Sequence, residues 1–284
     1  MGSQLKILLL LLSAIFLAAV AGVAWWFYTR EFKPDWDNRQ VLRDLAVAPP
    51  QAPDPGRSRY SEAMRLIEQE ERLMARDQLL DLVRHYQDSV RYRDAKRVIG
   101  EINADLLLSD LPGSQKKDYI VQRGDSLLAI ANRQQTTVDF IMRANNLVNT
   151  AIHPGDRLMV ATLEFKAVIS LGNETLTLLK DDRFFKEYPI QAVQLPDGVR
   201  LPFATELREK TAWAGDRRVT FNQAGYQAAD KWLQCGRHGL VLRSSAEAAR
   251  DDAMTVSAEI RLDRADIEEL FVLLLVSTPV TVVD

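Results

Sequence analysis

YIVQRGDSLLAIANRQQTTVDFIMRANNLVNTAIHPGDRLMVA, residues 119–161, is the stretch of sequence that decides the fold. It begins with an apolar strand, Tyr119-Ile120-Val121, and Gly124 then supplies the freedom for a tight turn. Asp125 is placed to cap the helix that follows, and its charge suits the positive start of a helix. The apolar residues of this helix lie on one face at helical spacing: Leu127, Ile130 and Ala131.

The second half of the stretch carries the signals for another helix and another strand. Thr136 or Thr137 can cap this helix, and Asn145-Asn146 closes it because Asn tolerates the left-handed conformation. Pro154-Gly155 then makes a turn, and Leu158-Met159-Val160 predicts a returning strand. The expected order is strand, helix, helix, strand.

This pattern resembles the lysin motif (LysM), a small module that binds polymers of N-acetylglucosamine. The resemblance rests on the Y-x-V strand, the G-D-S-L start of the first helix, the A-N-N-L end of the second, and the closing I-x-P-G-D-x-L. It implies a shallow sugar groove between two loops, whose exposed backbone groups hydrogen-bond an acetamido group. The expected groove residues are Gly124, Asp125, Ser126, Leu127, Asn149, Thr150, Ala151 and Ile152. The alternative is a LysM fold that has lost sugar affinity and acts as a spacer.

The chain from residue 163 to residue 284 predicts a mostly-β domain. A strand at Phe165–Leu171 is followed by the turn Gly172-Asn173 and by a second strand at Thr175–Leu179. Further segments of strand or helix character are Tyr188-Pro189-Ile190, Ile260-Arg261-Leu262, Asp266–Leu270 and Thr278–Val282. Together with Gly236-Arg237-His238-Gly239, this pattern resembles the catalytic domain of the L,D-transpeptidases.

The resemblance covers the fold but not the nucleophile. That family uses a cysteine thiolate, activated by a nearby His, in the motif S-H-G-C directly before I-R. On this alignment Ser257 replaces the His and Glu259 replaces the Cys, whereas His238 and Arg261 are retained. The resemblance therefore implies a degenerate catalytic site.

Cys235 is the only cysteine, so no disulfide can form within the chain. It is the one candidate for a displaced nucleophile, but it lies three residues before His238. On a single strand the two side chains would point to opposite faces, unless a β-bulge intervenes. We therefore expect Cys235 to be a small buried residue and His238 to be a structural one.

The amino-terminal segment Ile7–Tyr28 contains no charged residue. At about 1.5 Å per residue such a helix would span a hydrocarbon core of roughly 30 Å. Lys6 precedes it and an aromatic cluster ends it, which favours a cytoplasmic amino terminus and a single-pass anchor in a bacterial inner membrane. The bulk of the chain would then lie in the periplasm or cell-wall space. A signal peptide cleaved near Ala19-Val20-Ala21 is the alternative.

The remaining composition narrows the function classes. The net charge of −3 gives no electrostatic case for nucleic acid. No metal-ligand spacing and no Gly-rich phosphate loop occurs, so neither a metal nor another cofactor is expected. Residues 59–110 carry helical periodicity that weakly resembles a tetratricopeptide pair and could serve a protein partner.

The expected fold class is α+β and multidomain. It comprises a transmembrane helix at 1–30, a Pro-rich linker at 31–58, the helical segment at 59–110, a βααβ LysM module at 118–162 and the transpeptidase-like domain at 163–284. The expected function is a membrane-anchored envelope protein that binds peptidoglycan, with an inactive transpeptidase-like domain for binding or scaffolding. The alternative is an active L,D-transpeptidase that uses Cys235.

Overall fold

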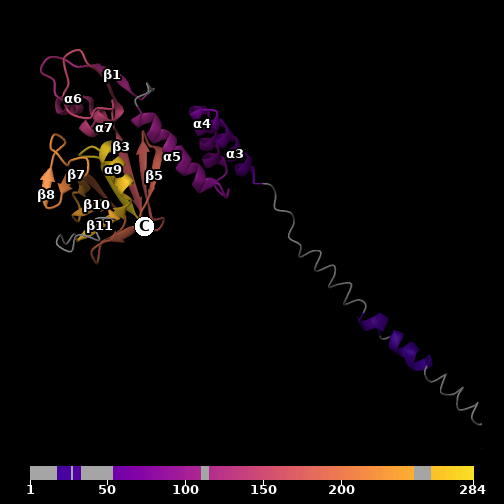
Figure 1. The fold of residues 1–284 in the computed structure, drawn as a ribbon. Helices are drawn as coiled ribbons and strands as arrows, with labels where there is room; N and C mark the ends of the chain where they lie inside the picture. Colours follow the sequence, from indigo (N-terminus) through magenta and orange to yellow (C-terminus); the bar gives the residue numbers. More distant parts are fainter. Residues whose placement is uncertain (1–17, 27, 33–53, 110–114, 246–256) are drawn as a thin grey trace, which may run out of the picture. The chain divides into compact units, whose positions relative to one another are not determined.

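The computed structural model describes residues 18–26, 28–32, 54–109, 115–245 and 257–284. The chain divides into two compact units, Met1–Asp54 and Pro55–Asp284 (Figure 1). The first unit contains a helical stretch at residues 18–26 and a π-helical turn, η1 (Tyr28–Phe32). Across the described residues, no helix combines the length and the apolar character needed to cross a membrane. Most of the expected anchor and most of the expected linker lie outside those residues.

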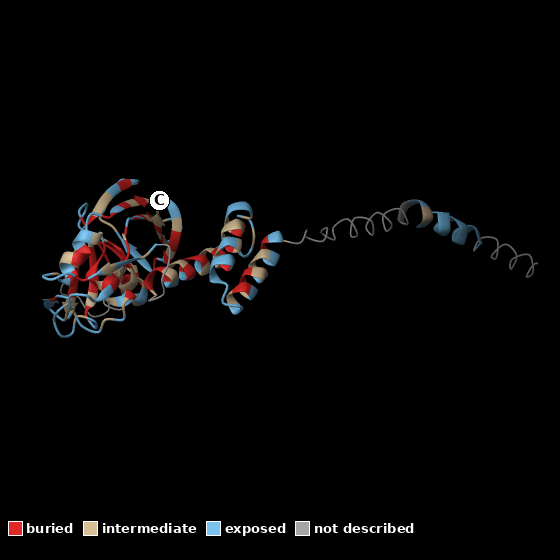
Figure 2. Ribbon diagram, turned by 90° about the horizontal axis from the view of Figure 1, so that it is seen from above, coloured by how far each residue is buried: buried red, intermediate tan, exposed pale blue. Residues whose placement is uncertain are grey.

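The second unit begins with three helices, α3 (Pro55–Glu68), α4 (Arg72–His85) and α5 (Tyr92–Leu108). Helix α3 starts inside the segment that we expected to be linker, because proline fits the first turn of a helix, where no amide donor is needed. The three helices share a small core of their own (Figure 2), made of Ala63, Leu66, Ala75, Leu79, Leu82, Ala95, Ile99 and Ile102.

Residues 117–160 form the expected strand, helix, helix, strand unit. Its elements are β1 (Lys117–Ile120), α6 (Leu127–Gln134), α7 (Val138–Ala144) and β2 (Arg157–Val160). Strands β1 and β2 pair antiparallel, with Tyr119 opposite Leu158. The expected cap at Asp125 is wrong, because the hydroxyl of Ser126 accepts the hydrogen bond from the amide of Ala129 at 3.2 Å. Thr137 caps α7.

The side chain of Asn145 links the end of α7 to strand β2 through hydrogen bonds. Its side-chain amide donates to the carbonyls of Ile141 (2.7 Å) and Met159 (2.8 Å), and its oxygen accepts from the amide of Met159 (2.6 Å). The next residue, Asn146, takes the left-handed conformation with φ of 51°, as expected.

The C-terminal domain is built on a ten-stranded sheet with the order β5-β4-β3-β12-β7-β9-β10-β11-β6, and β8 pairs with β7. The strands are β3 (Phe165–Ser170), β4 (Thr175–Lys180), β5 (Arg183–Pro189), β6 (Ala192–Gln194), β7 (Phe203–Ala214), β8 (Arg217–Val219), β9 (Asp230–Cys235), β10 (Leu240–Ser244), β11 (Ala258–Leu262) and β12 (Pro279–Val283). Strands β10 and β11 run parallel, as do β3 and β12. Helix α9 (Arg264–Leu273) contacts β9 and β10.

One large core joins the three parts of this unit. The buried cluster of the sheet includes Leu107 from α5 and Phe140 from α7, both almost fully buried. Asn103 on α5 also donates to the backbone carbonyl of Phe185 at 2.8 Å. The helical segment and the module at 117–160 are therefore packed onto the sheet and are not loosely tethered to it.

Gly100 allows α5 to approach strand β5 closely. A Cβ at this position would lie 2.8 Å from Cγ and 3.3 Å from Cα of Lys186, so backbone as well as side chain would have to move. Glycine to alanine inside an open helix stabilises by roughly 1 kcal/mol. Here we expect Gly100→Ala to destabilise instead, by about 1–3 kcal/mol. Urea denaturation of the wild type and the variant measures the sign, and a gain in stability would show that this contact is loose.

Candidate functional site

The loop between β1 and α6 is open to solvent at Gly124. This residue has φ of +89°, and a Cβ on it would meet nothing within 4 Å. Ser126, the next small residue, is exposed although its hydroxyl caps α6. The loop thus presents backbone with little side-chain cover, which is what a close approach by a sugar requires.

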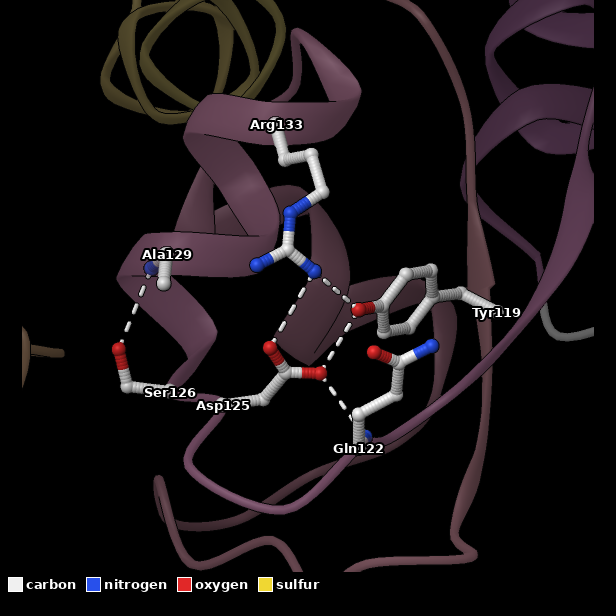
Figure 3. Close-up of polar contacts among 6 residues, drawn as sticks. All are labelled: Tyr119, Gln122, Asp125, Ser126, Ala129 and Arg133. Carbon is white, nitrogen blue, oxygen red and sulfur yellow. Dashed lines mark hydrogen bonds and ion pairs between the residues drawn. The ribbon is translucent and has the colours of Figure 1, made fainter.

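Asp125 holds this loop in place (Figure 3). Its carboxylate accepts hydrogen bonds from the amide of Gln122 (2.9 Å), the hydroxyl of Tyr119 (2.7 Å) and the guanidinium of Arg133 (3.2 Å). These bonds, the one from the Gln122 amide first, lower the pKa of Asp125. The side chain is only 6% exposed, so its oxygens stabilise the loop and are not free for a ligand.

The side chain of Leu127 is also withdrawn from the expected groove. It is 2% exposed and packs in the small core of this module with Ile130 and Val138. Of the first four predicted groove residues, Gly124 and Ser126 are exposed to solvent. The side chains of Asp125 and Leu127 instead hold the loop through internal hydrogen bonds and core packing.

The second predicted loop lies beside the first at the end of β1. Asn149 and Ala151 are exposed, and the side chain of Asn149 accepts a hydrogen bond from the amide of Ala151 at 3.0 Å. Thr150 and Ile152 are half-buried, and Ile152 packs against the core of the module.

The two loops are joined where β1 ends. The amide of Gly155 donates to the carbonyl of Val121, and the amide of Val121 donates to the carbonyl of Asp156, both at 2.8 Å. The first loop follows Val121 directly in the chain, and the second loop ends a few residues before Gly155. The fold therefore brings both predicted loops to one edge of the module.

A buried ionic cluster occupies the second candidate site, on β10 and β11. Glu259 is 2% exposed, and its carboxylate pairs with Arg243, whose Nε lies at 2.7 Å and Nη2 at 2.6 Å. It also pairs with Nη2 of Arg261, which is 31% exposed. Arg243 is 4% exposed and lies over the ring of Trp232, at 5.1 Å from its centroid.

Cys235 lies on the other face of the sheet. The alternate residues Leu242 and Ile260 belong to the main core together with Cys235, so Arg243 and Glu259 point away from that core. Cys235 is 4% exposed, and burial raises the pKa of its thiol to about 12. Both observations fit the expected small buried residue and stand against a thiolate nucleophile.

His238 is not on the strand that carries Cys235. Strand β9 ends at Cys235, and His238 is exposed in the turn before β10, with φ of 57°. Its ring packs edge-on against Phe203, with centroids 4.9 Å apart. A Cβ on the neighbouring Gly239 would lie 3.9 Å from the hydroxyl of Ser257, so the turn lies close to Ser257.

Residues 119–161 match the family model described as LysM domain, so this segment is a LysM domain. No curated protein matches the chain. Several solved structures of L,D-transpeptidases are similar to part of the chain.

The structure from Stackebrandtia nassauensis shares 16% identity, with 44% of this chain and 57% of that chain covered and a TM-score of 0.31. The Enterococcus faecium enzyme shares 15% identity, with 42% of this chain and 49% of that chain covered and a TM-score of 0.29. Mycobacterium tuberculosis L,D-transpeptidase 1 shares 14% identity, with 45% of this chain and 67% of that chain covered and a TM-score of 0.30. The chain thus spans about half the length of the first two of these proteins.

Proposed function

We propose that this chain is a bacterial cell-envelope protein that holds peptidoglycan glycan through its LysM domain. The observation that carries the proposal is the LysM domain itself, whose two loops meet at one edge with Gly124 and Ala151 exposed. In this proposal the apolar segment at 7–28 anchors the protein in the inner membrane, and the rest lies in the periplasm or cell-wall space. The helices at 55–108 would serve a protein partner.

The transpeptidase-like domain, in the same proposal, acts by binding or scaffolding. Support comes from Glu259, at the position that the sequence resemblance assigns to the nucleophile. Its two oxygens are taken by Arg243 and Arg261, and no thiol lies on that face within the described residues. An acyl transfer by cysteine would need a thiolate near a base, and Cys235 is buried on the opposite face.

Sedimentation with purified peptidoglycan sacculi tests the glycan proposal. Valine at Gly124 would be strained at φ of +89°, so the loop should relax into another shape. Restoring the binding shape would cost on the order of 1–3 kcal/mol, so we expect Gly124→Val to bind sacculi about 5- to 150-fold more weakly.

Gly198→Val is the matched control, since Gly198 has φ of +81° and equally open surroundings but lies in the C-terminal domain. It should pellet like the wild type. Equal loss in both variants would point to general misfolding, and no loss at Gly124 would remove the groove from the proposal.

Muropeptide analysis of the same pellets tests catalysis: new cross-links that disappear in Cys235→Ser would establish the enzyme instead.

A further inference from the structure

A cavity of 460 Å³ lies between the LysM domain and the sheet. Helix α6, helix α7 and the turn between them form one wall, and β7, β8 and the end of α9 form the other. Its volume falls within the range of about 300–1,000 Å³ that small-molecule sites occupy. Its apolar lining includes Leu128, Val138, Val219, Phe221, Leu275 and Val276. This site is separate from both the glycan loops and the Glu259 cluster.

One cation lines this cavity without a carboxylate partner. The ammonium of Lys210 donates to the carbonyls of Phe271 and Leu274 at the end of α9, the second at 2.9 Å. Among the described residues it makes no ion pair, and burial lowers its pKa to about 8. Asp139, the one carboxylate in the lining, accepts a hydrogen bond from the hydroxyl of Tyr226 at 2.8 Å. The ammonium of Lys210 also lies over the ring of Phe271, 4.5 Å from its centroid. Its charge is therefore met by carbonyls, an aromatic face and the more distant carboxylate of Asp139.

Thr136 supplies an unpartnered polar group in the same lining. The residue is 3% exposed, and its hydroxyl has no hydrogen-bond partner within the part of the chain that the structure describes. A buried hydroxyl without a partner costs about 1–3 kcal/mol. Its neighbour Thr137, in contrast, caps α7 and donates to the carbonyl of Val272 at 2.6 Å. A rotation of this side chain would turn the hydroxyl toward the cavity, where a polar ligand atom would satisfy it.

We propose that this cavity binds a small carboxylic acid with an apolar body, its carboxylate on Lys210 and a polar atom on Thr136. The apolar walls take the body of the ligand, and the carboxylate neutralises a cation that lacks an ion-pair partner. Such a ligand contacts the LysM domain and the sheet at once, so binding it tightens their contact.

Titration calorimetry of the full chain tests the proposal with two acids and their amides. Octanoate represents a fatty acid and N-acetyl-leucine a peptide carboxyl end; octanamide and N-acetyl-leucinamide are the neutral controls. We expect at least one acid to bind, about tenfold or more tighter than its amide, because the hydrogen bond to a charged group is the stronger. The acid that binds identifies the source of the ligand.

Variants of the lining residues test the contribution of each contact to ligand binding. Thr136→Val keeps the shape and should weaken binding of N-acetyl-leucine about fivefold, because its acetamide supplies the second polar group. Lys210→Met should remove the preference for acid over amide. Val276→Trp, at a position that lines the cavity and is 54% exposed, should block both probes. Lys180→Met is the matched control, since Lys180 is also part-buried with a carbonyl partner but does not line the cavity. Absence of binding by both acids, equal binding of acid and amide, or unchanged affinity in Thr136→Val and Lys210→Met would overturn the proposal.

Discussion

Glu259→Gln is expected to lower the free energy of unfolding by about 3–5 kcal/mol. The carboxylate is 2% exposed and neutralises Arg243, which is itself 4% exposed. Glutamine has nearly the same shape but no charge, so Arg243 would stay buried as an uncompensated cation. Arg261 is 31% exposed and can turn toward water, so most of the cost falls on Arg243.

Chemical denaturation of the wild type and three variants measures this effect. The double variant Glu259→Leu with Arg243→Met removes both buried charges and should recover most of the stability that Glu259→Gln loses. Glu206→Gln is the control, because Glu206 forms an exposed ion pair with Arg208, worth about 1 kcal/mol or less. A loss below 1 kcal/mol for Glu259→Gln would mean that Arg243 finds water or another acceptor.

The ionic cluster gives Glu259 a structural role in the sheet. Parallel pairing of β10 with β11 sets Arg243 beside Arg261, and Glu259 lies between the two charges. A small side chain at position 259 would leave two guanidinium groups without their acceptor. We infer that Glu259 serves the stability of the sheet.

The LysM domain could be predicted from sequence because its signals are local. Gly124, Thr137 and Asn146 lie in the turn, the cap and the left-handed end that their residue types favour. The assignment of Asp125 as a cap failed because Ser126 lies one residue later with the same capability, and Asp125 has a stronger set of partners in Tyr119, Gln122 and Arg133.

The second site could be predicted only in part. The position of Glu259 followed from the motif, but Arg243 did not, because its contact depends on a parallel register between strands separated in the sequence. The sequence left open whether His238 shares a strand with Cys235. Strand β9 ends at Cys235, and a strand end is set by pairing with neighbours and not by local pattern. Lys210 and Thr136 were missed for the same reason, since the cavity exists only when LysM is packed on the sheet.

Phe140→Ala is expected to destabilise the LysM domain and the C-terminal domain together, by about 3–5 kcal/mol. Phe140 belongs to LysM helix α7 but is fully buried in the core of the sheet. In a chain that begins at Pro55, Trp213 and Trp232 are the only tryptophans, and both lie on the sheet. Tryptophan fluorescence during denaturation therefore reports on the sheet alone, although the substitution is in LysM.

A shift of the tryptophan transition in Phe140→Ala would show that the two domains unfold as one unit. Val148→Ala, in a LysM residue that is 87% exposed, should change the free energy of unfolding by about 0.5 kcal/mol or less. An unchanged tryptophan transition, with sacculus binding lost, would mean instead that LysM unfolds independently. Joint unfolding has a functional consequence, because a LysM domain fixed to the sheet holds bound glycan at a set position relative to the Glu259 face.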